Sequence, residues 1–330
     1  MTRPDTALNT AFNTVFNNVL NVLLHRLWQG VLVALLVGTL TFVLMRLLPG
    51  DLAYRIAAGR YGYDLVDTAA AQAVRAELRL DMDALSALTA WLQDLARLNL
   101  GHSLVGGEPV WEELMQGLGN TLQLSLSTLL LAATLGLPLG LLAGLRPAGW
   151  LDRATLAAAV LLRALPPFVL GLVLILVLAV QLSALPAAGH GNASSLVLPT
   201  LTLGLPLAAL LTRVTRDAMA SVASSAYFSF ALTKGLSERQ ALLRHGLRNV
   251  GVPVVAWLGT QMVVLVEGVV VVETLFAWPG IGHALVHAVF GRDIPMIQGA
   301  ALTMGGLFVV LNTAVDLACQ AIDPRGRAAA

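Results

Sequence analysis

The sequence predicts an all-α integral membrane protein with six transmembrane helices. Of its 330 residues, 57% are hydrophobic and 12% are charged, whereas a soluble domain carries about 25% charged residues. Six stretches are apolar over about 20 residues, the length that a helix needs to cross the hydrocarbon of a bilayer. This composition excludes a cytosolic globular enzyme. The net charge of +1, without a basic run, excludes a nucleic-acid partner, and the single cysteine, Cys319, excludes an internal disulfide.

The N-terminal segment, residues 1–26, is predicted to form an amphipathic helix ahead of the first span. Leucine, valine and phenylalanine recur there at intervals of three and four residues, and asparagines occupy another face. This helix either lies on the membrane surface or lengthens the first transmembrane helix, and we favour the second interpretation. No apolar stretch followed by a small-residue cleavage site is present, so we expect no cleaved signal peptide.

The six spans follow in chain order, and their apolar character predicts each of them. The expected ranges are 27–48, 121–145, 154–182, 196–212, 250–278 and 297–317. Spans two to six form a core that covers residues 119–323, and a short tail covers 324–330. The third span carries Pro166 and Pro167 near its start, and the fourth span is the shortest.

The distribution of basic residues predicts that both chain termini lie in the cytoplasm. Lysines and arginines concentrate in the short loops on one side of the spans, and that side of a membrane protein faces the cytoplasm. The long loop 49–118, with helices expected near 69–80 and 84–98, then lies outside, as does the segment 279–295. The loop 213–249 lies in the cytoplasm. Its six basic and two acidic residues, and its scarcity of proline and glycine, predict a helical docking element.

A series of short motifs runs along the chain in the same order as the spans. They are Leu47-Leu48-Pro49-Gly50-Asp51, Leu98-Asn99-Leu100-Gly101-His102-Ser103-Leu104, Asn120-Thr121-Leu122, Lys234-Gly235-Leu236-Ser237-Glu238-Arg239, Leu243-Arg244-His245-Gly246-Leu247-Arg248-Asn249, Val272-Glu273-Thr274-Leu275-Phe276-Ala277-Trp278-Pro279-Gly280-Ile281-Gly282, Arg292-Asp293-Ile294-Pro295 and Asp323-Pro324-Arg325. Each string alone is weak evidence, but the series closely resembles the permease subunits of binding-protein-dependent ATP-binding-cassette (ABC) importers. The resemblance is to the dipeptide, oligopeptide and nickel branch, and it covers essentially the whole chain. It implies a type I importer permease fold with a cytoplasmic coupling helix.

The resemblance implies a subunit that moves a peptide, nickel or metal-chelate solute across the cell inner membrane. The implied partners are a second homologous permease subunit, two ATPase subunits, a periplasmic or extracellular solute-binding protein and membrane lipid. The chain has no GxxxxGK[ST] phosphate loop, so ATP and Mg²⁺ are expected on the ATPase subunits and no cofactor on this chain. Motifs of the HExxH or GxSxG kind are absent from the sequence as well, so we do not expect an enzyme.

The resemblance also implies that the loop 213–249 contacts the ATPase. The implied coupling residues are Ala231, Lys234, Gly235, Ser237, Glu238 and Arg239. A glycine at 235 lets the chain turn where a Cβ would clash, and Ser237 is placed to cap the following helix. The family pattern has arginines where this chain has Ser229 and Leu232, which indicates an ATPase with its own matched surface. Arg244 and Arg248 fit ordinary positive-inside anchors at least as well.

Two glutamates belong to the predicted fifth span and are candidates for the translocation pathway. Glu273 precedes Trp278-Pro279-Gly280 and either braces this bend by hydrogen bonds or contacts the solute. Glu267 either lines the pathway, where it would attract a cationic or amine-bearing solute, or is protonated and packed between helices. On one continuous helix these two side chains would point about 120° apart.

Two histidines, His283 and His287, are four residues apart in the segment 279–295. On a helix they share one face at metal-ligand spacing. Two histidines without a third ligand are weak evidence, so we favour surface polarity and assign no metal site. The candidates for the side that receives the binding protein are Asp51, Trp278, Pro279, Gly280, His283 and His287.

An ion-coupled secondary transporter is the alternative function. Such a protein is expected to show inverted repeats and charges at the middle of the membrane, and only Glu267 points that way. An intramembrane enzyme would need paired carboxylates or a nucleophile with its base, and the sequence shows neither arrangement.

Overall fold

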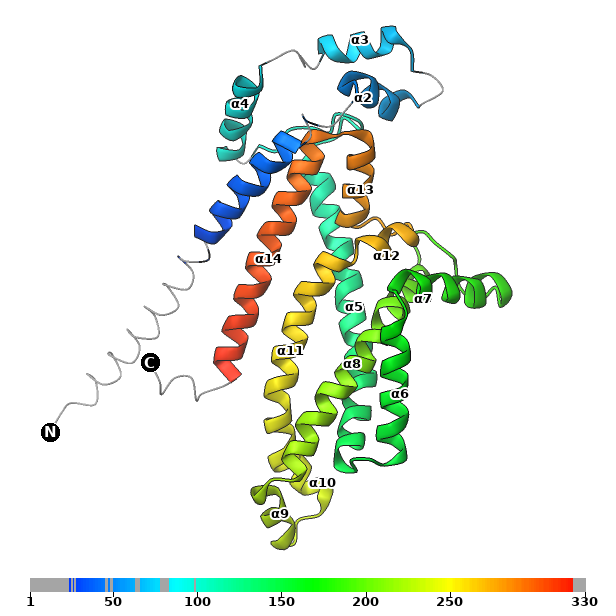
Figure 1. Ribbon diagram of the computed structural model, residues 1–330, viewed down its shortest axis with the longest axis vertical. Coiled ribbons are helices and arrows are strands. Elements are labelled where there is room, and N and C mark those ends of the chain that lie inside the picture. Colours follow the sequence, from blue (N-terminus) through cyan, green and yellow to red (C-terminus); the bar gives the residue numbers. More distant parts are fainter. Residues whose placement is uncertain are drawn as a thin grey trace, which may run out of the picture. The chain divides into compact units, whose positions relative to one another are not determined.

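The computed structural model describes residues 24, 26, 28–44, 47, 50–62, 66–77, 83–97 and 99–322. These residues form helices joined by turns and short loops (Figure 1), which confirms the predicted all-α fold class. The expected N-terminal helix, 1–26, lies almost wholly outside the described residues, and the expected tail, 324–330, lies outside them entirely. The chain divides into two compact units. The first comprises Met1–Leu114 with His287–Ala314, and the second comprises Met115–Val286 with Val315–Ala330.

Four helices of the described part are long and apolar enough to cross a membrane, and a bent pair of helices adds a fifth span if it is counted as one. The four are α5 (Val110–Leu145), α8 (Val197–Ala223), α11 (Leu247–Gly268) and α14 (Ile294–Ile322). They contain or overlap the predicted second, fourth, fifth and sixth spans. The helix Trp28–Leu44 covers part of the predicted first span, and neighbouring residues of 27–48 lie outside the described part. The count of six spans therefore stays a prediction.

The predicted third span, 154–182, is not one straight helix. Helix α6 (Trp150–Ala164) is bent by 100° from the pair that follows, α7 (Pro167–Leu174) and the π-helix η1 (Ile175–Gln181). Leu165 and Pro166 between them have ψ angles of 125° and 141°, because a residue that precedes proline is disfavoured from helical geometry. The chain therefore turns sharply here and does not continue straight.

Other boundaries also differ from the expected ones. Helix α5 begins eleven residues before the predicted second span, so the loop 49–118 ends within a helix. This loop contains α3 (Thr68–Glu77) and α4 (Ala84–Ala96), close to the expected helices, and an additional helix, α2 (Leu52–Tyr61). The predicted fifth span is divided, because α11 ends at Gly268 and a separate helix, α12 (Val270–Leu275), follows.

In the first unit, the beginning of α14 is tied to the segment that precedes α5. Asp293 accepts hydrogen bonds from the Ser103 hydroxyl and from the Val105 N–H, the latter at 3.3 Å. Its other carboxylate oxygen accepts the N–H of Met296 at 3.3 Å, which caps α14. Both Ser103 and Asp293 are buried, so this contact fixes the entry into the helix.

In the second unit, α8 lies against α5, α6 and α11 (Figure 1). Gly136, Gly140 and Gly144 on α5 are spaced by four residues and all face α8. A Cβ added at Gly140 would lie 2.5 Å from the Cβ of Thr215 and 2.7 Å from the carbonyl oxygen of Thr212. Small residues at this spacing let two helix backbones approach closely in a membrane. We call these three residues the glycine stripe.

Candidate functional site

The predicted coupling residues lie on a short segment that follows α8. This α9–α10 segment comprises α9 (Ala226–Thr233) and α10 (Glu238–Ala241) and lies at the ends of α8 and α11 (Figure 1). The hydroxyl of Ser225 accepts the N–H of Phe228 at 3.4 Å and caps α9. Phe228 and Ala231 are buried in an apolar cluster to which Val222 of α8 and Ala241 of α10 contribute. Helix α9 is therefore held firmly against the end of α8.

The turn between α9 and α10 depends on Gly235, whose φ angle is 88°. The Gly235 N–H donates to the Leu232 carbonyl at 2.9 Å, and the Leu236 N–H donates to the Ala231 carbonyl at 3.3 Å. These two bonds form a Schellman cap at the end of α9. An added Cβ would meet no atom within 4 Å, so the expected clash with neighbouring atoms is absent. Glycine is required here by its backbone angle.

Helix α10 begins with a reciprocal cap. The Ser237 hydroxyl accepts the N–H of Gln240 at 3.3 Å, and the Gln240 side chain accepts the N–H of Ser237 at 3.1 Å. This is a capping box, which satisfies two N–H groups at the start of the helix. The cap at Ser237 was predicted and its partner Gln240 was not. Glu238 and Arg239 form the first turn of α10, and their side chains lie outside what the structure describes.

Helix α9 exposes two aromatic side chains beside its buried residues. Tyr227 is 45% exposed and Phe230 is 59% exposed, and the Lys234 Nζ lies 4.6 Å from the centre of the Phe230 ring. Positions 227, 230 and 234 lie on one side of a helix. Residues 225–233 carry no charge. The exposed face of α9 is therefore uncharged and partly aromatic, with Ser229 and Thr233 also exposed. Lys234 places one cation at the C-terminal end, where the helix dipole favours positive charge.

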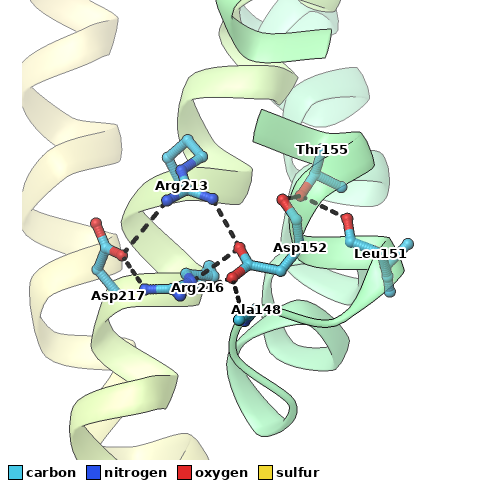
Figure 2. Close-up of polar contacts among 7 residues, drawn as sticks. All are labelled: Ala148, Leu151, Asp152, Thr155, Arg213, Arg216 and Asp217. Carbon is cyan, nitrogen blue, oxygen red and sulfur yellow. Dashed lines mark hydrogen bonds and ion pairs between the residues drawn. The ribbon is translucent and has the colours of Figure 1, made fainter. Parts of the chain in front are cut away.

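A charged cluster that was not predicted from the sequence links α6 to α8 (Figure 2). Asp152, in the first turn of α6, has an 8% exposed side chain. One carboxylate oxygen lies 2.8 Å from the Arg213 Nη1 and 2.9 Å from the Arg216 Nε, and the other lies 2.7 Å from the Arg216 Nη2. Arg216 therefore binds the carboxylate in two-pronged fashion, the strongest and most directional form of this contact. We call Asp152, Arg213 and Arg216 the Asp152 clamp.

The Asp152 clamp also fixes the turn between α5 and α6. The Ala148 N–H donates to the Asp152 carboxylate at 2.9 Å, and Ala148 has a φ of 62°, a conformation that costs roughly 1–2 kcal/mol for a residue other than glycine. One carboxylate thus holds α6, α8 and the turn before α6. A signal in the sequence does mark this residue, because Asp152 is the only acidic residue between Glu113 and Asp217.

At the other end of the second unit, the buried side chain of Glu273 braces the turn between α12 and α13 (Ile281–Gly291). One carboxylate oxygen accepts the Thr121 hydroxyl of α5 at 2.6 Å. The other accepts the N–H groups of Gly282 and His283 at 2.9 and 3.1 Å, where a carboxylate suits the N-terminus of α13. Of the two sequence-based interpretations of Glu273, these contacts support bracing.

The residues between α12 and α13 are hydrogen-bonded to α5. The Trp278 Nε1 donates to the Asn120 carbonyl at 3.0 Å, and the Asn120 side-chain amide donates to the Pro279 carbonyl at 2.8 Å. A Cβ at Gly280 would lie 2.0 Å from the Glu273 carboxylate, so only glycine allows this close approach. The structure thus brings Glu273, Trp278, Pro279 and Gly280 together, with Asn120 as the partner that joins them to α5.

Asp51 lies in the first unit, where it caps α2 through the Ala53 N–H at 2.9 Å and pairs with Arg75 at 2.8 Å. Partial burial raises the pKa of Asp51, but the hydrogen bonds from Arg75 and Ala53 outweigh it and hold the pKa below its ordinary value. Glu267 lies near the end of α11, and its side chain lies outside what the structure describes. Because α11 ends at Gly268, the expected 120° relation to Glu273 on one helix does not apply.

His283 and His287 lie on α13 at the predicted spacing of four residues. Within the described ranges of the chain, no group of three or more histidine, cysteine, aspartate or glutamate side chains is arranged to hold a metal ion. The absence of a metal site at these histidines stays a prediction from the sequence.

Comparison with known proteins points to the same family that the sequence motifs resemble. Residues 136–328 match the family described as binding-protein-dependent transport system inner membrane component. The chain is 38% identical over 310 residues to the probable peptide ABC transporter permease protein y4tP of Sinorhizobium fredii, with 92% of this chain and 97% of that protein covered. It is 35% identical over 289 residues to the glutathione transport system permease protein GsiC of Escherichia coli K12, with 88% and 93% covered.

A solved structure, described as inward facing conformations of the MetNI methionine ABC transporter, is similar in fold. The TM-score is 0.50 at 17% identity, and the match covers 64% of this chain and 96% of that chain.

Proposed function

The chain belongs to the family of binding-protein-dependent transport system inner membrane components, and on this premise we propose that it forms the solute pathway of an ATP-driven importer. Membership makes it an inner-membrane, multi-pass ABC transporter permease, which is a transport subunit and not an enzyme. The observation that carries the proposal is the α9–α10 segment. Its helix α9 is capped, is packed against the end of α8 and exposes two aromatic side chains, and the motif Lys234–Arg239 supports its assignment as the ATPase contact.

The proposed complex contains this chain, a second homologous permease, two ATPase subunits and an external solute-binding protein. ATP and Mg²⁺ bind to the ATPases. When the ATPases close on ATP, they draw the two coupling segments together, and the spans change between inward-open and outward-open states. In this arrangement the α9–α10 segment and both chain termini lie in the cytoplasm. The segment 279–295 and helices α2 to α4 face the binding protein.

We propose a short peptide as the solute. Support comes from the relatives, which are named for peptide and glutathione transport. Nickel and metal chelates remain predictions from the family resemblance. The associated binding protein, purified from cells and analysed by mass spectrometry, identifies the solute. A bound peptide or peptide-like thiol supports the proposal, and bound nickel or a metal chelate contradicts it.

Uptake in cells tests the proposed function. The chain is co-expressed with the ATPases, the second permease and the binding protein, and uptake of the identified solute is followed with and without vanadate. We expect uptake that vanadate inhibits and that disappears when the ATPase genes are omitted. Uptake that persists without the ATPases favours the ion-coupled secondary transporter instead.

A further inference from the structure

Among the contacts of α8 within the second unit, those with α5 and with α6 differ in kind. The glycine stripe holds α8 against α5 by close backbone packing. The Asp152 clamp holds α8 to α6 by charge-assisted hydrogen bonds, two of them to the same guanidinium (Figure 2). Apolar packing resists separation but has little directional preference, whereas a two-pronged carboxylate–guanidinium contact fixes both distance and orientation.

The clamp lies between the apolar part of α8 and the α9–α10 segment. Helix α8 ends at Ala223, seven residues beyond Arg216, which is about 10 Å along a helix. Helix α9 begins at Ala226, and its buried residues Phe228 and Ala231 pack against the last turn of α8. A displacement of α9 is therefore a displacement of the end of α8, close to the clamp.

Helix α6 in turn leads to the 100° bend before α7. Its first turn holds Asp152, which also accepts the Ala148 N–H of the preceding turn. A movement that reaches Asp152 therefore moves the α5–α6 turn and the start of α6 together. Separating the Asp152 carboxylate from the arginines would leave buried charges without a partner, which is unfavourable. The contact should therefore persist while the helices move.

We propose that Asp152 is a positioning residue for transport, which passes the movement of α9 from α8 to α6. The proposal rests on the proposed function, because the movement that it transmits is the one that the ATPases impose on α9. Without the clamp, the end of α8 follows α9 while α6 and the bend beyond it stay behind. ATP hydrolysis then continues without solute passage.

The chain provides a matched control in Asp217. Its carboxylate lies 2.9 Å from the Arg216 Nη1 and 3.9 Å from the Arg213 Nη2, so it contacts the same two arginines. Asp217 is itself on α8 and its side chain is 63% exposed. It therefore neutralises the arginines without linking α8 to another helix.

The experiment compares Asp152→Asn with Asp217→Asn in the complete transporter, reconstituted in liposomes with its ATPases and binding protein. The measured quantities are the amount of assembled complex, the rate of ATP hydrolysis and the solute taken up per ATP hydrolysed. For Asp152→Asn we expect an assembled complex that hydrolyses ATP and a fall of about tenfold or more in uptake per ATP, within the range of ordinary coupling energies. Asp217→Asn should keep the wild-type ratio. Arg216→Lys, which keeps the charge but loses the two-pronged contact, should give an intermediate ratio.

Two results overturn the inference. One is a wild-type ratio of uptake to hydrolysis in both Asp152→Asn and Arg216→Lys. The other is a parallel loss of complex, hydrolysis and uptake in both variants, which would make the clamp a purely structural contact. A wild-type complex that takes up no solute with ATP overturns the proposed function and this inference with it, so the two failures are distinguishable.

Discussion

Single residues set the geometry at both ends of the second unit. Gly235 forms the turn between α9 and α10 with a backbone angle that other residues rarely adopt. Glu273 receives three hydrogen bonds in a fully buried position and joins α5 to the start of α13. Gly235 is required for its backbone angle and Glu273 for its hydrogen bonds, so a substitution at either position has a predictable effect.

Replacing Gly235 by aspartate should abolish ATP-driven uptake while leaving membrane insertion intact. A residue other than glycine pays roughly 1–2 kcal/mol at this angle, and the cheapest relief is to alter the turn and displace α10 from α9. Gly251→Ala in α11 is the control, because an added Cβ there also meets no atom within 4 Å and the position is helical. Uptake measured in membrane vesicles checks both variants. Wild-type uptake by Gly235→Asp would remove the coupling assignment.

Replacing Glu273 by alanine should destabilise the protein by at least about 2 kcal/mol, since the Thr121 hydroxyl and two backbone N–H groups lose their acceptor. Thermal unfolding of the detergent-solubilised chain measures this effect. Glu112→Ala, at an exposed position in the first turn of α5, is the control and should change stability by less than about 0.5 kcal/mol. Equal melting temperatures for Glu273→Ala and the wild type would show that the bracing contacts contribute little.

Local residue chemistry was predictable at these positions, and long-range pairing was not. Glycine and serine at 235 and 237 predict a turn and a cap because both effects act within a few residues. Asp152 finds its arginine partners 61 and 64 positions away, and no local pattern reveals that pairing. Both arginines belong to the loop 213–249, whose basic residues predicted a cytoplasmic docking element and not a contact with Asp152.

At the scale of elements, close helix contacts and helix ends decide the arrangement. The apolar windows overlap the four long apolar helices of the described part, because burial in lipid requires length and apolarity, which are both visible in the sequence. They did not locate the start of α5, because Glu112 and Glu113 lie in its first turn, where the helix dipole stabilises acidic side chains outside the apolar part. The apolar windows also did not predict the 100° bend between α6 and α7.

The glycine stripe yields a prediction at this scale. Gly140→Ala should destabilise the packing of α5 against α8 by about 1–3 kcal/mol, since the added methyl group overpacks the contact. Gly119→Ala on the same helix, where a Cβ meets no atom within 4 Å, should be neutral or slightly stabilising. Thermal unfolding of the two variants side by side measures the difference. A Gly140→Ala variant as stable as Gly119→Ala would show that α5 and α8 are free to move apart.

At the scale of the whole molecule, the proposed function requires α9 to face the cytoplasm and α4 to face the opposite side of the membrane. Cys319 is the only cysteine, so Cys319→Ala provides a background for single labelling sites. Ser229→Cys on the exposed side of α9 should react with a membrane-impermeant maleimide only in inside-out vesicles. Thr89→Cys, exposed on α4, should react only in right-side-out vesicles. Labelling of both sites from the same side would overturn the predicted orientation.

The proposed function requires that this chain moves solute only when an ATPase drives it. The most direct measurement places the chain alone, and the complete complex with the binding protein, in separate liposomes and follows solute accumulation. We expect accumulation by the complete complex with ATP, and none by the chain alone under a sodium or pH gradient. Sustained gradient-driven accumulation by the chain alone would contradict it.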